Sequence, residues 1–354
     1  MYSRRFVGFN LFVGRAALGA PGIYVGVNFS HGTPRASSPT NNRQGLIVNN
    51  IIMEKIYIKN ENNDYQYFET LKRNRTKRHA NGEFFVEGVR NINEAFKPEN
   101  GWEINSLIFS GEINLSDWAD NLINKYITDK QKNKSKKLFI TKKELLHKLS
   151  DKEDKESPSE IIITVKIKDE NIKNLNLSKS SAVMIFDRPS NKGNLGTIIR
   201  SCDSFGIDAL ILTGHSVDLY DCETIRASMG AFFKQKIIVE PSFKEIADWT
   251  DKQKSLFNGL QISGTSAKTS KPSEILNEKT FSKNNDTPVI VIIGNETMGM
   301  SSNFYGLCDN LIRIPMSESS SSSSLNVSCA ASVILYEIYK QKIIKKEKEY
   351  GTHD

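Results

Sequence analysis

The sequence lacks the cysteine and histidine spacings that mark disulfide frameworks and metal sites. Its four cysteines include no Cys-x-x-Cys pair, and its five histidines are scattered over 354 residues without the spacing of metal ligands. We therefore expect reduced thiols, no bound metal and a cytoplasmic location. No apolar stretch is long enough to span a membrane, whereas an apolar content of 38% is sufficient for a packed core.

Common nucleotide-binding and hydrolase signatures are missing as well. The chain contains no Gly-x-Gly-x-x-Gly loop, no Gly-Lys-Ser or Gly-Lys-Thr phosphate loop, and no Gly-x-Ser-x-Gly elbow. Each of these motifs supports its chemistry through close approach of the backbone to a phosphate or through an exposed nucleophile. Their absence argues against a dinucleotide-dependent dehydrogenase, an ATPase and an α/β-hydrolase.

The first 52 residues contain five arginines but no lysine, aspartate or glutamate, and the composition changes abruptly at Met53. We favour an over-extended reading frame whose true start is Met53. An organelle transit peptide also fits an arginine-containing, acid-free start, whereas a secretory signal fits worst because Arg15 interrupts its apolar part. We expect residues 1–52 to be an extra segment that is disordered or is not part of the protein.

The formal net charge of +7 suggests an anionic partner, but its distribution restricts that inference. From residue 53 onward, 43 basic residues stand against 41 acidic ones, a net charge of only +2. A nucleic-acid surface must therefore be a local patch. A charge run is commonly a solvated face, but against this neutral background we expect phosphate contact from the densest basic cluster, which consists of Lys72, Arg73, Arg75, Lys77 and Arg78.

Residues 53–176 alternate short strands with amphipathic helices, which predicts a small α/β domain. In one of these helices Val89, Ile92 and Phe96 recur at helical spacing. The helix that follows in the chain has three leucines on one side. The predicted strands are 84–86, 104–111 and 160–168, and the predicted helices are 87–96 and 141–150.

A second unit, residues 181–343, alternates strands and helices strictly, which predicts a parallel, doubly wound sheet. Its first helix turns Leu195 and Ile198 inward and ends at Gly206. A charged tail, residues 344–354, follows the last helix. The predicted strands are 181–189, 208–214, 236–241, 260–266, 288–296 and 310–316, and the predicted helices are 194–206, 223–233, 242–251 and 325–343.

Ligands of such sheets bind beyond the carboxyl ends of the strands. The segments that follow four of the predicted strands combine glycine, asparagine, serine and charged residues in a way that ordinary connections do not require. We therefore expect a ligand site where they meet. These segments are 194–200, 263–267, 294–301 and 324–328.

Together these segments resemble the signature motifs of the SpoU (TrmH-type) RNA 2′-O-ribose methyltransferases of the SPOUT superfamily. Any one motif alone is a weak signal, but their order over residues 181–343 makes the match specific. Residues 53–176 resemble, more loosely, the small α/β RNA-binding domain that precedes the catalytic domain in many members. The matching motifs are 191–212, 225–233, 289–302 with 308–316, and 324–337.

The resemblance implies a knotted parallel-sheet SPOUT methyltransferase domain behind the small RNA-binding domain, and a homodimer with its active site at the subunit interface. It implies S-adenosyl-L-methionine as the cofactor and structured RNA as the substrate, with no membrane partner. Ribosomal RNA is the expected substrate, because the extra amino-terminal domain is typical of members that act on it, and transfer RNA is the alternative. DNA lacks the 2′-hydroxyl and is not expected to react.

By the same resemblance, Arg200 acts on the ribose 2′-hydroxyl. A guanidinium stays protonated in proteins, so Arg200 either activates the hydroxyl or anchors the substrate phosphate and stabilises the developing alkoxide. The residues expected in the catalytic site are Asn194, Arg200, Glu296, Ser324 and Asn326. Those expected to bind the cofactor, mainly through the backbone around them, are Thr265, Gly294, Ile314, Met316 and Leu325.

Several of these residues also have an ordinary structural interpretation. Gly294 and Gly299 fit turns, and Glu296 fits the start of a helix. Ser324 and Asn326 fit a helix cap. We favour the functional interpretation because all of them occur together in the order of the family motifs.

Two other functions stay open. A protein that kept the fold and lost catalysis would bind RNA through the basic cluster with a strong salt dependence, whereas a metabolite-binding α/β protein would bind no RNA. The complete catalytic set argues against the first, and the basic cluster against the second. The serine run at 317–323, where the family has a shorter loop with glycine, supports the first and bears on the cofactor contacts of this loop.

Overall fold

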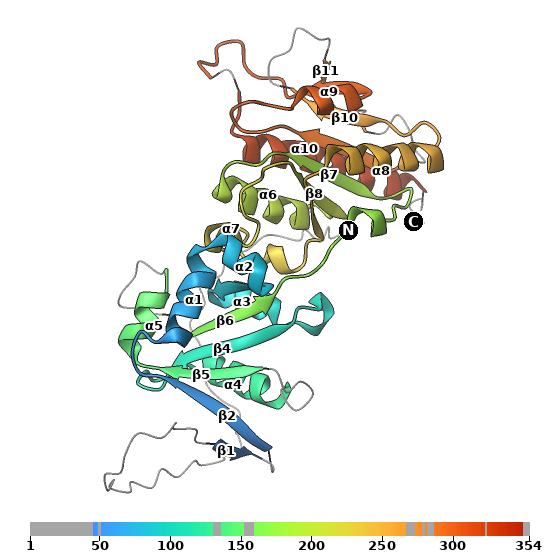
Figure 1. Cartoon of the computed structure of the whole chain (residues 1–354). Coiled ribbons are helices and arrows are strands. Elements are labelled where there is room, and N and C mark those ends of the chain that lie inside the picture. The colour runs from blue at the N-terminus through green and yellow to red at the C-terminus, as the bar shows by residue number, and fades with distance from the viewer. Residues whose placement is uncertain are drawn as a thin grey trace, which may run out of the picture. The chain divides into compact units, whose positions relative to one another are not determined.

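Two β-sheets organise the chain, one in each half (Figure 1). The structure is a computed structural model. It describes residues 45–48, 51–129, 136–151, 159–266, 273–277, 280–281, 287–322 and 324–349, with side chains for those between 55 and 342. No helix in these ranges is long and apolar enough to cross a membrane.

The C-terminal sheet has seven strands, and each described pair of neighbours is parallel. In sheet order the strands are β11 (Glu274–Ile275), β13 (Asn310–Arg313), β10 (Ile262–Thr265), β12 (Val289–Ile293), β7 (Ala182–Asp187), β8 (Ala209–Thr213) and β9 (Ile237–Glu240). β7 and β8 are buried along their whole length, which explains their continuous apolar sequences. The predicted parallel sheet is therefore confirmed.

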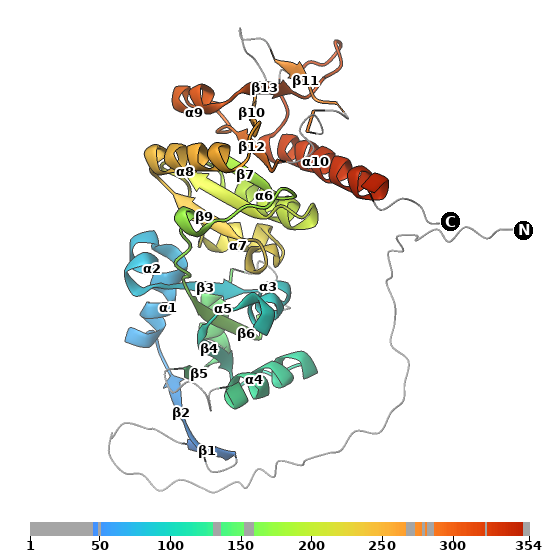
Figure 2. The same ribbon diagram turned by 90° about the vertical axis from the view of Figure 1, so that its right-hand side faces the viewer.

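Helices cover both faces of this sheet. They are α6 (Lys192–Ser204), α7 (Cys222–Ala227), α8 (Phe243–Leu256), α9 (Ser302–Leu307) and α10 (Val327–Glu349). α6, α7 and α10 pack on one face, and α8 and α9 on the other (Figure 2). α6 buries Leu195 and Ile198 as predicted, and α10 buries Ile334 and Leu335 against the same face.

The N-terminal sheet has six strands of mixed direction, in the order β1 (Gly45–Val48), β2 (Ile51–Ile58), β5 (Lys137–Thr141), β4 (Ile104–Ser110), β6 (Ile161–Lys166) and β3 (Glu83–Glu87). Its helices are α1 (Asn63–Arg73), α2 (Arg75–Asn81), α3 (Val89–Ala95), α4 (Asp117–Asp129) and α5 (Lys143–Leu149), with a 3-10 turn at Pro98–Asn100. A second 3-10 turn, Ile172–Asn174, packs instead in the C-terminal core beside α8. α1 and α5 cover one face, and α3 and α4 the other. In α3, Ile92 is buried, but Val89 is 47% exposed and does not share its face.

The described residues before Met53 belong to strands. β1 and β2 pair antiparallel, with Gly45 opposite Glu54, and β2 runs across Met53. Residues 1–44 and 49–50 lie outside the described part, and a translation start at Met53 stays a prediction. At the other end, α10 continues into the expected charged tail, of which residues 350–354 are not described.

The predicted helix 223–233 is wrong in its length. α7 stops at Ala227, and a separate 3-10 turn, η4 (Ala231–Phe233), follows. Between them, Met229 and Gly230 take φ angles of 54° and 98°, which a right-handed helix cannot contain. A Cβ on Gly230 would lie 3.0 Å from a side-chain carbon of α3, so packing against the N-terminal half of the chain requires a glycine at this break.

Two members of the predicted phosphate-binding cluster are buried. Arg78 is 1% exposed; its Nε donates to Asp218 at 2.8 Å, and its Nη1 donates to two backbone carbonyls of α1. Lys72 pairs with Asp151 at 2.6 Å. The prediction is corrected for Lys72 and Arg78, because their charges are paired with carboxylates inside the protein and are not available to a phosphate.

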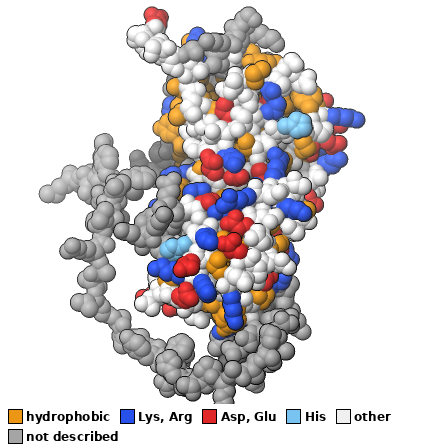
Figure 3. Space-filling view, turned by 60° about the vertical axis from the view of Figure 1, so that its left-hand side comes forward, with side chains coloured by type: hydrophobic (Ala, Val, Ile, Leu, Met, Phe, Trp, Pro, Cys, Tyr) orange, Lys and Arg blue, Asp and Glu red, His pale blue; other side chains and the backbone are white. Residues whose placement is uncertain are grey.

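The other three members of the cluster are exposed. Arg73 pairs with Glu69 one helical turn away, and Arg75 donates to the Ser216 carbonyl at 2.8 Å. On the face drawn in Figure 3, lysine and arginine side chains alternate with aspartate and glutamate side chains and do not gather into one patch. Because Lys72 and Arg78 are buried and Arg73 and Arg75 have partners within the protein, the cluster is a weaker positive patch than the sequence suggests.

An aromatic cluster joins the two halves into one core. The ring of Phe84, in β3, lies 4.9 Å from that of Tyr220 and 5.6 Å from that of Phe232. Trp102 lies 5.6 Å from Phe232 and donates its Nε1 hydrogen to the Phe233 carbonyl at 2.8 Å. Because aromatic side chains bury large apolar areas, this cluster and the Arg78–Asp218 pair fix one sheet against the other.

Replacing Arg78 by alanine should destabilise the protein strongly. The change leaves the Asp218 carboxylate, which is 6% exposed, without its main partner, and breaking a buried ion pair from one side costs about 3–5 kcal/mol. The free energy of unfolding in urea measures the loss. Arg73→Ala is the matched control, because Arg73 is 71% exposed and a surface pair contributes about 0.5 kcal/mol. Similar losses in both variants would contradict the assigned role of Arg78.

Candidate functional site

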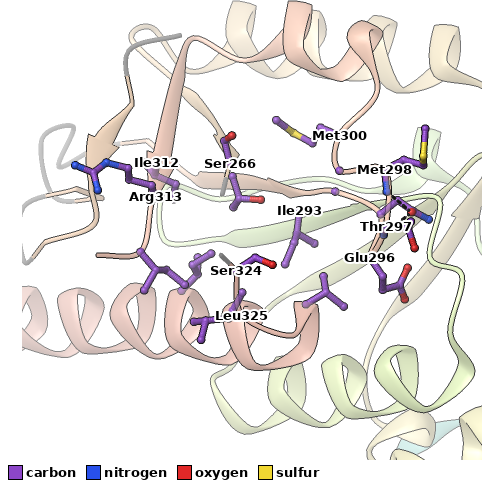
Figure 4. Close-up of a pocket in the computed structure, with 18 of the residues that line it drawn as sticks. Ser266, Ile293, Glu296, Thr297, Met298, Met300, Ile312, Arg313, Ser324 and Leu325 are labelled. Carbon is purple, nitrogen blue, oxygen red and sulfur yellow. Dashed lines mark hydrogen bonds between the residues drawn. The ribbon is translucent and has the colours of Figure 1, made fainter. Parts of the chain in front are cut away.

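A cavity of about 430 Å³ opens at the carboxyl edge of the C-terminal sheet. It lies between the ends of β10, β12 and β13 and the start of α10 (Figure 4). Glu296 and Ser324, predicted for the catalytic site, contribute to its wall. So do all five residues predicted to bind the cofactor, which are Thr265, Gly294, Ile314, Met316 and Leu325.

The loop after β12 forms one wall of the cavity and is closed on itself. The backbones of Asn295 and Gly299 exchange two hydrogen bonds, of 3.1 and 3.0 Å. The Asn295 side-chain oxygen accepts the backbone amides of Thr297 and Met298, two and three residues further on, at 2.9 and 3.0 Å. A Cβ at Gly294 would overlap the backbone of Met300. This turn therefore requires glycine at Gly294, and Gly299, at φ 68°, favours one.

The pair Asp187–Arg188 ties this loop to the end of β7. Arg188 binds the Asp187 carboxylate with two hydrogen bonds of 2.9 Å and donates to the Gly299 carbonyl at 3.0 Å. Asp187 also accepts the Ser301 amide at 2.7 Å, and the Asn295 side chain donates to the Arg188 carbonyl at 2.7 Å. The Arg188 backbone has a φ of 52°, a conformation that these contacts hold in place.

Glu296 connects the same loop to the start of α6. Its carboxylate accepts hydrogen bonds from the Ser190 amide at 2.9 Å, the Ser190 hydroxyl at 2.6 Å and the Asn191 amide at 3.0 Å. Partial burial raises the pKa of Glu296, but these hydrogen bonds outweigh it and hold the pKa below its ordinary value. Glu296 is therefore an ionised acceptor at neutral pH and not a proton donor.

Asn194 and Asn326 bring the starts of α6 and α10 together. The Asn326 amide donates to the Asn194 side-chain oxygen at 3.2 Å. The Asn326 oxygen accepts the Ser328 amide at 2.8 Å, so Asn326 also caps α10 and its ordinary interpretation holds as well. Asn191 caps α6 by accepting the Asn194 amide at 2.8 Å, which links this pair to Glu296.

Arg200 is the one predicted catalytic residue that the structure does not bring to the others. It lies six residues after Asn194 in α6, about 9 Å further along the helix axis, and it is exposed. It does not line the cavity. Its side chain makes no hydrogen bond or ion pair with any residue that the structure describes.

Sequence reasoning missed the residues that hold the site in shape. Asp187 and Arg188 were interpreted only as the end of a strand, and Ser190 was not considered. The position of Asp187 at the carboxyl end of a buried strand was an available signal. The positive φ of Arg188 has no signal in the sequence, because it depends on a loop more than 100 residues away.

The cavity suits a small molecule that has both polar and apolar parts. Leu276, Ile293 and Ile312 supply apolar walls, and Glu296 is the only acid and Arg313 the only base among the described lining residues. The volume lies within the range of about 300–1,000 Å³ that is usual for such sites. In the part of the chain that the structure covers, no group of three metal-ligating side chains occurs.

Replacing Gly294 by alanine should destabilise the site. The new methyl group meets backbone atoms that cannot move aside, and overpacking of this kind costs about 1–3 kcal/mol. Gly306→Ala is the control: no atom lies within 4 Å of a Cβ there, and alanine favours a helix by about 1 kcal/mol over glycine. Thermal unfolding of both variants measures the difference. Gly294→Ala with unchanged stability would contradict the packing of this loop.

Replacing Glu296 by glutamine should make the stability less dependent on acid pH. Because the folded protein holds the pKa of Glu296 below its ordinary value of 4.5, its stabilisation is complete above that value and is lost as the pH falls through the folded-state pKa. Urea unfolding of both proteins between about pH 6 and pH 3 tests this. The free energy of unfolding of the wild type should exceed that of Glu296→Gln at about pH 6, and this difference should shrink as the pH falls. A difference that stays constant would contradict the lowered pKa of Glu296.

Comparisons with known proteins agree with this geometry. The model of the SpoU rRNA Methylase family matches residues 181–336, and that of the SpoU L30e-like domain matches residues 62–163. The chain is 34% identical over 286 residues to the 23S rRNA (uridine(2479)-2′-O)-methyltransferase of Streptomyces viridochromogenes, which covers 81% of this chain and 92% of that protein.

Solved structures share the fold over both halves of the chain. The SpoU methyltransferase AviRb from Streptomyces viridochromogenes, in complex with the cofactor AdoMet, matches with a TM-score of 0.67 and 32% identity, over 80% of this chain and 98% of that one. An AdoMet-bound rRNA methyltransferase from Sinorhizobium meliloti, 20% identical, matches with the same TM-score over 81% and 98%. As its motifs predicted, the chain belongs to the SpoU rRNA methylase family.

Proposed function

We propose that this protein transfers a methyl group from S-adenosyl-L-methionine to a ribose 2′-hydroxyl in ribosomal RNA. The observation that carries the proposal is the cavity at the carboxyl edge of the sheet, lined by all five residues that the family motifs assign to the cofactor. A relative matched over 92% of its length is a 23S rRNA 2′-O-methyltransferase, which supports ribosomal RNA. Transfer RNA is the alternative, because another relative, from Staphylococcus epidermidis, is named a TrmH family tRNA/rRNA methyltransferase.

The cavity residues would align the two reactants. The bound cofactor supplies a methyl group on a sulfonium, which is its own leaving group, so the protein needs mainly to exclude water and to position the ribose hydroxyl. Glu296, ionised, would fix the backbone at the start of α6, and the Asn194–Asn326 bond would hold the two helix starts at the opening. The backbone around Thr265, Gly294, Ile314, Met316 and Leu325 would hold the cofactor.

Arg200 is proposed to act at the cavity of a second copy. Arg200 is exposed and is not among the residues that line the cavity of its own chain, and a guanidinium can bind a phosphate through two parallel hydrogen bonds. There it would activate the hydroxyl, or anchor the substrate phosphate and stabilise the developing alkoxide. A site completed in this way requires a homodimer.

The α6–α10 face offers the surface for such a dimer. Tyr336 is 53% exposed, Tyr339 39% and Val333 41%. Phe205, at the end of α6, lies 5.9 and 6.0 Å from the two tyrosine rings. An apolar patch of this kind is typical of a contact surface. The knotted path of the C-terminal segment, expected from the resemblance, belongs to the same proposal.

RNA contact by the N-terminal half is proposed for the three exposed members of the basic cluster, Arg73, Arg75 and Lys77. The match of residues 62–163 to the SpoU L30e-like domain supports a substrate-binding role for this half. The 2′-hydroxyl requirement excludes DNA as a substrate. We propose a cytoplasmic enzyme without a membrane partner.

Methyl transfer from labelled S-adenosyl-L-methionine to RNA tests the proposal. The RNA comes from cells that lack this gene, and the products are separated by size. The wild type should label large ribosomal RNA, and Arg200→Ala should lose about 10²–10³-fold in rate, as when one transition-state donor is removed. Cofactor binding by calorimetry should not change in this variant.

Lys244→Ala is the matched control, because it also removes one exposed charge and lies in α8, on the other face of the sheet. Label in transfer RNA alone would show that the substrate is transfer RNA and not ribosomal RNA. If the folded protein binds RNA but transfers no label, the protein is an RNA-binding protein and not a methyltransferase.

A further inference from the structure

A strip of four exposed residues runs along the junction of the two halves, where α7 lies between α6 and α3 (Figures 1 and 2). We call it the α3–α7 strip; it consists of Val89, Arg90, Arg226 and Met229. Its members come from α3, from α7 and from the break after α7. The backbone holds these together, because a Cβ on Gly230 would lie 3.3 Å from the Arg90 carbonyl.

The two apolar members of the strip are held open to solvent. Val89 is 47% exposed and Met229 41%. Met229 does so in a left-handed conformation, with φ 54°, which is uncommon for a residue with a side chain and costs on the order of 1 kcal/mol. Glycine would adopt this backbone conformation at a lower cost. The presence of methionine despite the strain therefore points to a function for its side chain.

The two arginines of the strip give it a positive charge. Arg90 is exposed and makes no ion pair with any described residue. Arg226 is 54% exposed and lies 3.6 Å from Asp151, a carboxylate that already pairs with Lys72 at 2.6 Å. The acid of α3 itself, Glu94, is paired with Lys97 at 2.7 Å. Arg226 also interacts with the nearby Glu87 carboxylate, so the uncompensated charge of the strip is that of Arg90.

We propose that the α3–α7 strip holds the RNA segment that connects the N-terminal half to the target nucleotide. Arginine forks bind phosphates, and exposed methionine and valine side chains offer an adaptable apolar surface to bases and riboses. The strip adjoins α6, whose outer side carries Arg200. The inference rests on the proposed function. The strip would supply phosphate contacts that the buried Lys72 and Arg78 cannot make.

Equilibrium binding of 23S ribosomal RNA, transcribed in vitro, tests the strip without any methyl transfer. Arg90→Ala should weaken binding about tenfold and lower the slope of log K against log salt by about 1, as for one lost phosphate contact. Arg90→Lys should restore the slope. Lys244→Ala, which removes an exposed charge from α8, should bind like the wild type.

Met229→Gly separates a functional role from a structural one. Glycine accepts the left-handed backbone, so the free energy of unfolding should not fall, while the dissociation constant for the RNA should rise. In methyl-transfer assays both strip variants should raise KM for RNA and leave kcat and cofactor binding unchanged.

The outcomes for the strip and for the proposed function are distinct. Wild-type RNA affinity and salt slope in Arg90→Ala and Met229→Gly would overturn the strip even if the enzyme methylates RNA. Changed self-association of these variants by sedimentation, with unchanged RNA binding, would make the strip a protein interface and overturn it too. RNA binding that depends on the strip, in a protein that transfers no methyl group, would support the strip and overturn the proposed function.

Discussion

The buried carboxylate of Asp187 is the fixed point on which the site depends. It binds Arg188 and the Ser301 amide, so that the end of β7 and the loop after β12 are held as one piece. That loop presents Glu296 to the residues before α6. The start of α6 in turn meets the start of α10 through Asn194. One chain of hydrogen bonds therefore connects two walls of the cavity, the loop after β12 and the start of α10, through the start of α6.

A second constraint couples the two halves of the chain. The Arg78–Asp218 pair and the aromatic cluster around Phe84 fix the N-terminal sheet on the C-terminal one. The cost is that the positive charge of Arg78 is used inside the protein, where it cannot attract a polyanion. In our proposal, RNA binding then depends on surface side chains near the junction, such as Arg90, whose position relative to the cavity is set by the same contacts.

The C-terminal fold was largely predictable because its strands are continuous apolar runs and its helices have clear periodicity, as in β7 and α6. The family motifs named five residues expected to bind the cofactor, and all five line one cavity. The break at Met229 could not be predicted, because it follows from the packing of Gly230 against Arg90 and Glu94 of α3, far earlier in the chain. The burial of Arg78 could not be predicted for the same reason, because its partner, Asp218, lies 140 residues away in the sequence.

The most direct test of methylation at the 2′-hydroxyl is alkaline hydrolysis of the labelled ribosomal RNA. A methylated 2′-oxygen cannot attack the neighbouring phosphate, so the linkage next to it survives alkali. Label recovered in an alkali-resistant dinucleotide is the predicted result. Label recovered in single nucleotides would place the methyl group on a base and contradict the proposed chemistry.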